Sequence, residues 1–172
     1  TELTSSLVGS EMCIRDSLYT EAQAVLEEML GGDGWYVNKI EACKVLAACL
    51  EAKGDKNAAL GALFRSFAYG APRGSVCGEA GRIFRETGRH REAVFWYETA
   101  LGCPDHSPEG DFDDVPARTL FPLLGLVCSH WALGQREQAY ECHRRAAQLA
   151  PDHPAVLHNE KFFRETGLNT AK

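Results

Sequence analysis

The chain has 172 residues, of which 45% are hydrophobic and 24% charged, with a formal net charge of −6. This composition fits an ordinary globular protein with a sizeable core. The acidic balance argues against nucleic-acid binding, and no apolar run approaches the roughly 20 residues that span a bilayer. None of the seven cysteines forms a Cys-x-x-Cys pair. We therefore expect small buried thiols in a reducing, cytoplasmic environment.

The first segment, residues 1–17, stands apart from the rest of the chain. Residues 7–17, LVGSEMCIRDS, do not continue the helical pattern of the residues after them. They resemble the translation of one reading frame of a transposase-based sequencing adapter, at every codon. We therefore expect 1–17 to be an adapter-derived, non-native segment, with the protein itself beginning near residue 18.

A helix is predicted next, over residues 20–31, TEAQAVLEEMLG. Thr20 is expected to be its N-cap. Its expected apolar face consists of Ala24, Val25, Leu26, Met29 and Leu30.

An internal repeat follows, marked by a glycine with an alanine five residues later. The glycines are Gly54, Gly88 and Gly134. The first two are 34 residues apart, which is the period of the tetratricopeptide repeat (TPR), and the next interval is twelve residues longer. Each glycine is expected to end a first helix in a left-handed cap, and Asp55 to cap the second helix of its unit.

These anchors predict an all-α fold, an antiparallel helix-pair (TPR-like) solenoid over residues 18–172 with about three full repeats. Small residues such as Gly81 and Ala93 would let the paired helices approach closely, and Tyr97 would fill the space between turns. The His130 and His143 rings are expected to pack in the same way. The predicted units are 40–73, 74–107 and 120–153, with a loop insertion over 103–118 and a capping helix over 154–166 that begins at Pro154.

Catalytic and metal-binding patterns are not found in the sequence. Asp111, Asp113 and Asp114 lie in the predicted loop, but they lack the alternation, glycine and distal glutamate of a calcium loop. We expect a solvated loop there, no metal site, no cofactor and no catalytic residue in this chain.

The concave surface of such a solenoid is lined mainly by exposed positions of the first helix of each unit, and it is where a partner is expected to bind. The predicted groove is charged at one end and apolar at the other. The partner is expected to be a protein or peptide, with no nucleic acid or membrane involved. The groove residues are Lys44, Arg82, Arg85, Phe121, Leu124 and Trp131.

Three stretches carry a more specific resemblance: residues 62–84, 91–101 and 154–163. Among their features are Ser66-Phe67-Ala68-Tyr69 with Pro72-Arg73, and Asn159 with Phe162-Phe163. Together they resemble the C-terminal helical region of bacterial, Firmicutes-type family-2 glycosyltransferases, the group that includes sublancin-type S-glycosyltransferases. Gly74-Ser75 replaces the glutamate that this family places after Pro-Arg, and the loop at 103–118 is more acidic than in the family.

The resemblance implies a C-terminal fragment of a transferase whose catalytic domain lies outside this chain. Nucleotide-sugar and divalent metal would bind that missing domain. The helices would serve acceptor recognition or self-association, so the partner would be the acceptor substrate or a second copy of the parent. The alternative is a free-standing TPR scaffold that binds a peptide segment in its concave groove.

Overall fold

A computed structural model describes residues 2–106 and 114–168, and the side chains of residues 2–16 lie outside that description. Within these ranges all the regular elements are helices, so the all-α, helix-pair architecture is confirmed. The chain divides into two compact units, Thr1–Ala71 and Pro72–Lys172. This boundary falls beside the predicted border between residues 73 and 74. A single repeat domain over 18–172 stays a prediction.

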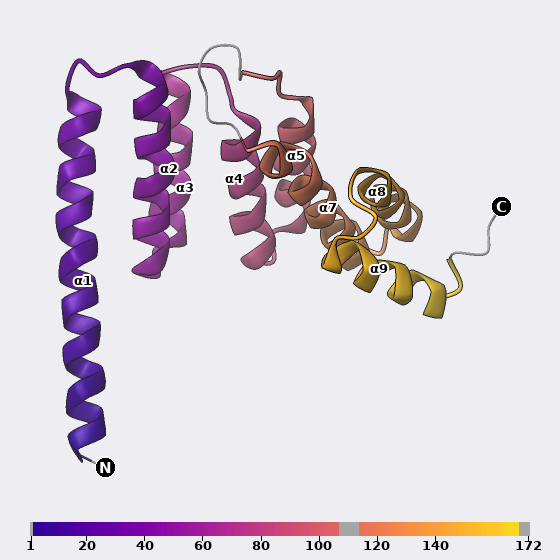
Figure 1. The fold of residues 1–172 in the computed structure, drawn as a ribbon, viewed down its shortest axis with the longest axis horizontal. Helices are drawn as coiled ribbons and strands as arrows, with labels where there is room; N and C mark the ends of the chain where they lie inside the picture. The colour runs from indigo at the N-terminus through magenta and orange to yellow at the C-terminus, as the bar shows by residue number, and fades with distance from the viewer. Residues whose placement is uncertain (1, 107–113, 169–172) are drawn as a thin grey trace. The chain divides into compact units, whose positions relative to one another are not determined.

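The first unit contains three helices and a short 3₁₀ turn. Helix α1 lies beside α2, and α2 pairs with α3 in antiparallel fashion (Figure 1). Arg65 on α3 forms an ion pair with Glu27 on α1, which ties the outer helices together. The elements are α1 (Glu2–Gly31), α2 (Tyr36–Ala52), α3 (Lys56–Arg65) and η1 (Ser66–Ala68).

The helix predicted over residues 20–31 is part of a longer one, its predicted cap is wrong, and its predicted apolar face is right only at Leu26 and Leu30. Thr20 lies inside α1, where its hydroxyl accepts a hydrogen bond from Lys53 Nζ at 3.4 Å. Val25 is 65% exposed, whereas Leu30 is buried. The less exposed positions of the described part follow a helical period through Tyr19, Gln23, Leu26 and Leu30. Residues next to each other in a helix point about 100° apart, so Val25 turns away from the face that Leu26 shares with α2.

The second unit contains the other predicted helix pairs. Helices α4 and α5 match the unit predicted over 74–107, α7 and α8 match 120–153, and α9 matches the capping helix (Figure 1). Helix α5 also packs on α7, and α9 packs on α8. The elements are α4 (Gly74–Glu86), α5 (His90–Gly102), α6 (Val115–Arg118), α7 (Leu120–Ala132), α8 (Arg136–Leu149) and α9 (Pro154–Glu165).

The turns between paired helices have the predicted geometry. Gly54, Gly88 and Gly134 have φ angles of 87°, 76° and 75°, the left-handed region that residues with a Cβ rarely adopt. Asp55 Oδ1 accepts a hydrogen bond from the Ala58 N–H at 2.8 Å, so it is the N-cap of α3. Both predictions are confirmed. Pro154 also occupies the first turn of α9, as expected.

The core of the second unit is built around Tyr97, which is 3% exposed. Its ring lies between two glycines, Gly81 on α4 and Gly125 on α7. A Cβ on Gly81 would lie 2.7 Å from the ring, and a Cβ on Gly125 would overlap it. Helix α5 therefore sends one aromatic side chain against both its own partner helix and the first helix of the next repeat.

The predicted loop over 103–118 is wrong at its C-terminal end, because residues 115–118 form the single-turn helix α6. This turn packs on the start of α4 at two glycines. A Cβ on Gly74 would lie 2.5 Å from Arg118 Cβ, and a Cβ on Gly78 would lie 3.1 Å from the Ala117 carbonyl oxygen. Helix α6 can therefore lie against α4 only because these two positions lack a side chain. Asp111 and Asp113 lie outside the described residues.

Three successive aromatic residues of α5 test how burial sets stability. Tyr97 is buried, Trp96 is half-buried and Phe95 is 60% exposed. We expect Tyr97→Ala to lower the free energy of unfolding by about 3 kcal/mol and Phe95→Ala to change it by less than about 0.5 kcal/mol. Trp96→Ala should fall between the two. Denaturant titration of the three variants measures the order, and an equal loss at Phe95 and Tyr97 would contradict this packing.

Candidate binding surface

The six residues predicted to line a groove are divided between the two units. Lys44 lies on α2 in the first unit, where it forms an ion pair with Glu41 at 2.9 Å. The other five lie in the second unit. Arg82 and Arg85 are on α4, and Phe121, Leu124 and Trp131 are on α7. The structure thus brings five of the six to neighbouring helices of one compact unit, since α4 and α7 pack on each other.

The two arginines of α4 are held by side chains of their own neighbourhood. Arg82 lies between two glutamates of the same helix, 2.9 Å from Glu79 and 3.0 Å from Glu86. Pairs of this kind on a helix surface contribute only a few tenths of a kcal/mol to stability. Their larger effect here is to neutralise the charge of Arg82, so this end of the face is polar without a strong net charge.

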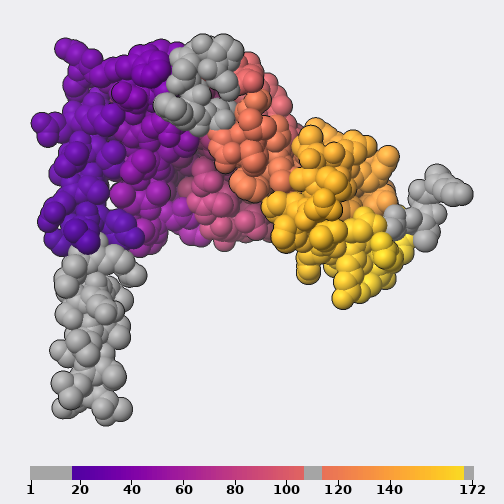
Figure 2. Space-filling model, in the orientation of Figure 1, coloured from indigo at the N-terminus to yellow at the C-terminus, as the bar shows by residue number. Residues whose placement is uncertain are grey.

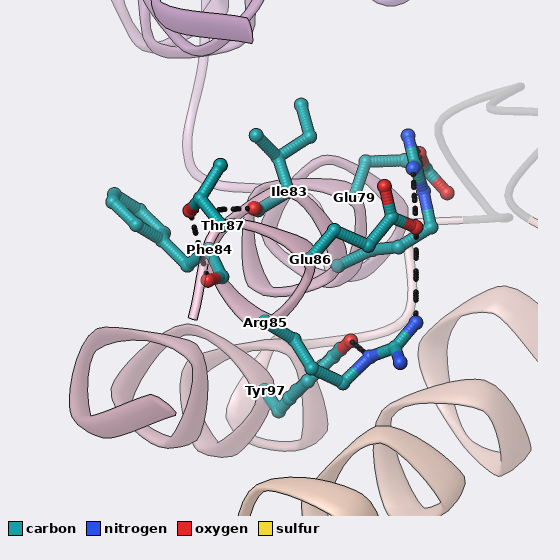
Figure 3. Close-up of polar contacts among 8 residues, drawn as sticks. Glu79, Ile83, Phe84, Arg85, Glu86, Thr87 and Tyr97 are labelled. Carbon is teal, nitrogen blue, oxygen red and sulfur yellow. Dashed lines mark hydrogen bonds and ion pairs between the residues drawn. The ribbon is translucent and has the colours of Figure 1, made fainter. Parts of the chain in front are cut away.

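Arg85 joins the surface to the core. Its Nε donates a hydrogen bond to the Tyr97 hydroxyl at 3.3 Å, and its guanidinium lies 3.8 Å from Glu86 (Figure 3). Burial raises the pKa of the Tyr97 phenol, so this hydroxyl is neutral at physiological pH and accepts the bond. Arg85 also lies near Cys128, and α4 packs on α7. These contacts place the charged side of α4 next to the apolar side of α7.

Helix α6 covers the start of α4, a contact that the sequence did not predict. Ser75 is buried, and Gly78 faces the Ala117 carbonyl oxygen. The signal in the sequence was the pair of glycines four residues apart, Gly74 and Gly78, because such spacing on one helix face permits close approach of another segment. The exposed part of the α4 face is therefore its second half, which carries Arg82 and Arg85.

The apolar side of the surface is the exposed face of α7. This helix contains no Asp, Glu, Lys or Arg. Phe121 is 48% exposed and lies edge-on to the ring of His153, with ring centroids 6.4 Å apart. Leu124 is half-buried and Cys128 is exposed. Positions 121, 124 and 128 are three and four residues apart, so they form one stripe along the helix.

Trp131, the last predicted groove residue, lies under the capping helix. Its ring packs edge-on against Phe162 and Phe163 of α9, with centroids 4.8 and 5.9 Å away. Helices α8 and α9 form one continuous surface in the space-filling view (Figure 2). The apolar stripe open to a partner therefore ends near Cys128, because α9 packs over Trp131.

The capping helix is held by a buried histidine. His143 is 1% exposed, stacks on Phe163 with centroids 5.1 Å apart, and shares a hydrogen bond of 2.8 Å between its Nε2 and Glu160 Oε2. His130 is also buried, with Nδ1 2.7 Å from Gln135 Oε1. The predicted packing role of both rings is confirmed. Their polar partners were missed, because neither partner stands at a spacing that singles it out.

Possible metal ligands and thiols can also be placed from the structure. Among the described residues, no group of three or more His, Cys, Asp or Glu side chains is placed to hold a metal ion. Four cysteines are buried as predicted, and burial raises the pKa of the Cys43 thiol to about 11, which keeps it protonated and unreactive at neutral pH. Cys128 departs from that prediction, because it is exposed.

Comparison with known proteins agrees with the repeat assignment. The family model of the tetratricopeptide repeat matches residues 74–102, which are helices α4 and α5. Neither the curated proteins nor the solved structures yield a match. Within the described residues, no helix has the length and apolar character needed to cross a membrane. The second unit thus contains a tetratricopeptide repeat, a fold that presents helix surfaces to protein partners.

The His143–Glu160 contact predicts how stability depends on pH. The hydrogen bond from His143, aided by Arg164, lowers the pKa of the Glu160 carboxyl below its ordinary value. A carboxyl with a lowered folded-state pKa contributes stability above its unfolded-state pKa of about 4.3, and that contribution is lost as pH falls through the folded-state value. We expect Glu160→Gln to reduce the fall in thermal midpoint on acidification below about pH 4.5.

A matched control for this prediction lies on the same helix. Glu165 is 65% exposed at its side chain and lies 3.9 Å from Lys161. Glu165→Gln should leave the pH dependence of the thermal midpoint as in the parent chain. An unchanged pH dependence in Glu160→Gln would show that the contact with His143 does not stabilise α9.

Proposed function

We propose that the second unit is a protein-interaction module that binds an apolar peptide segment along α7. The observation that carries this proposal is the uncharged α7 helix, with its exposed stripe at Phe121, Leu124 and Cys128. An aromatic side chain that is half exposed gains free energy when a partner covers it, and clustered exposed apolar side chains often mark interaction sites. The repeat match over 74–102 supports the same class of function.

The charges beside the stripe favour an apolar anchor over an acidic one. Glu79 and Glu86 neutralise Arg82, and Arg85 is engaged by the Tyr97 hydroxyl. A carboxylate on the partner would have to compete with these contacts. We therefore expect Phe121 to contribute most of the affinity and the two arginines to set the orientation of the peptide through polar contacts at the rim.

A peptide-display experiment tests this function. A random peptide library would be selected on the full chain, and the enriched peptides measured by calorimetry against two variants. Phe121→Asp should weaken binding at least about tenfold, because it places a charge on the apolar stripe at its most exposed aromatic residue. Phe95→Asp is the matched control, since it changes a similarly exposed aromatic residue on α5. Equal binding by both variants, or no enrichment of any peptide, would contradict the proposal.

A second proposal concerns the parent protein and rests on the resemblance of residues 62–84, 91–101 and 154–163 to family-2 glycosyltransferases. In such a parent, the same α7 surface would recognise the acceptor or a second copy of the enzyme. Nucleotide-sugar and divalent metal would then bind another domain. The adapter-like residues 7–17 belong to the same hypothesis, since they would mark a junction ahead of the native chain.

The uninterrupted gene tests the second proposal directly. Reading upstream from the codon of Leu18 should give an α/β domain with a nucleotide-sugar motif in place of the adapter-like codons. A start codon near residue 18 would favour the free-standing scaffold. Codons at 7–17 unlike those of the adapter would contradict the junction.

A further inference from the structure

Two cysteines of the matched repeat lie where its helices meet. Cys77 is on the first turn of α4 and is 0% exposed. Cys103 directly follows α5 as its C-cap residue and is half-buried. No disulfide joins the cysteines of the described residues, and the Cys77 and Cys103 thiols lie close enough to interact. Burial of a cysteine in an apolar core does not by itself place a second thiol beside it.

The backbone holds the two thiols together. A Cβ on Gly74 would lie 3.2 Å from the Ala100 carbonyl oxygen, so the start of α4 lies against the end of α5. Cys77 and Cys103 each follow these two residues by three positions. The Cys103 N–H also donates to the Ala100 carbonyl at 3.3 Å, which fixes the cap. Helix packing and a backbone hydrogen bond therefore hold the two thiols near each other. The thiols can come together without unfolding of α4 or α5.

One of the two thiols can be reached from solvent. Cys103 lines a shallow pocket of about 290 Å³, together with Leu101, Leu123, Arg118 and Arg145. Arg118 forms an ion pair with Asp105 at 3.0 Å, and Arg145 is an exposed cation on α8. Guanidinium groups beside a thiol favour its thiolate, which is the reactive form. The pocket thus gives a small oxidant access to Cys103, with two arginines in the same lining.

We propose that Cys77 and Cys103 are a redox-active pair that forms a reversible disulfide within the tetratricopeptide repeat when a peroxide is present. The Cys103 thiolate attacks one oxygen of hydrogen peroxide, which gives a sulfenic acid and releases hydroxide that becomes water. The Cys77 sulfur then attacks the sulfenic sulfur, and the departing hydroxyl takes the Cys77 proton as a second water. The two thiols lose two electrons and two protons, and the peroxide is reduced to two waters.

The order of the two steps follows from the surroundings of the thiols. The interaction with Cys103, together with burial, raises the pKa of the Cys77 thiol, so Cys77 stays protonated at neutral pH. It is therefore a poor first nucleophile and can act only on a sulfenic sulfur that is already beside it. The finished bond would tie the start of α4 to the end of α5, while the Arg85–Tyr97 hydrogen bond ties the last turn of α4 to the middle of α5.

Peptide mapping tests this proposal, because trypsin cleavage separates the relevant cysteines. The fragment 74–82 contains only Cys77, the fragment 92–118 contains only Cys103, and Cys128 falls in 119–136. The reduced full chain would be treated with hydrogen peroxide under native conditions, blocked with N-ethylmaleimide and digested. We expect 74–82 linked to 92–118, about 2 Da lighter than the sum of the reduced fragments, and released by dithiothreitol.

Two variants and one melting measurement test the pairing further. Cys103→Ser should abolish the linked fragments, and Cys128→Ser, at an exposed position, should leave their yield unchanged. The oxidised parent chain should also melt at a higher temperature than the reduced chain, because the bond restricts the unfolded state. Circular dichroism checks that both variants fold.

Other outcomes would overturn the proposal. Linked fragments that form faster in urea than under native conditions would show that the fold does not bring the thiols together. Oxidation of Cys103 to sulfinic acid while Cys77 remains a thiol would show that Cys77 does not react with the sulfenic acid. Disulfides that involve Cys128, formed in the same yield as the Cys77–Cys103 disulfide, would show that the fold does not favour this pair.

Discussion

The second unit depends on one aromatic ring held between two glycines. Tyr97 projects from α5 and contacts Gly81 of α4 on one side and Gly125 of α7 on the other. A methyl group at either glycine would clash with the Tyr97 ring. The spacing of α4, α5 and α7 therefore depends on the size of this ring and on the absence of a side chain at both glycines. The contact links the two helices of one repeat and also links that repeat to the next. Close packing of this kind tolerates little change in volume.

The position of the proposed binding surface follows from this contact. Because Tyr97 reaches both α4 and α7, the exposed faces of those helices lie on neighbouring segments of one unit. The Tyr97 hydroxyl accepts a hydrogen bond from Arg85, which places the polar side of the surface beside the apolar stripe of α7. Where α4 begins and α5 ends, Cys77 and Cys103 form a second contact between the same two helices. The two helices of the repeat therefore contact each other through Tyr97 near the middle of α5 and through the two thiols at the start of α4 and the end of α5.

Much of the fold could be predicted from the sequence because its turns need particular residues. A glycine with positive φ cannot easily be replaced, so Gly54, Gly88 and Gly134 mark the turns whatever the remaining residues are. The small and aromatic positions at Gly81 and Tyr97 follow from the same register. The buried face of α1 was harder to predict, since Val25 and Leu26 are both apolar and only the position of α2 decides which one is covered.

The site was predicted less fully than the fold, because neighbouring segments cover part of it. Helix α6 covers the start of α4 at Gly74 and Gly78, and α9 covers Trp131. Both covering segments depend on tertiary contacts that leave no periodic signal in the sequence. The contacts at His143 and Cys103 were missed for a related reason, since their partners are 17 and 26 residues away along the chain. The exposure of a residue on a single helix, as at Phe121, was easier to predict.

The central claim is that Gly125 is required because the Tyr97 ring occupies the space beside it. A double-mutant cycle with Gly125→Ala and Tyr97→Ala, measured by hydrogen exchange in α4, α5 and α7, tests this claim directly. Gly125→Ala should destabilise these helices by about 1 to 3 kcal/mol when Tyr97 is present and by much less when it is absent. Gly61→Ala is the control, because a Cβ there meets nothing within 4 Å. Additive effects of the two substitutions would contradict the claim.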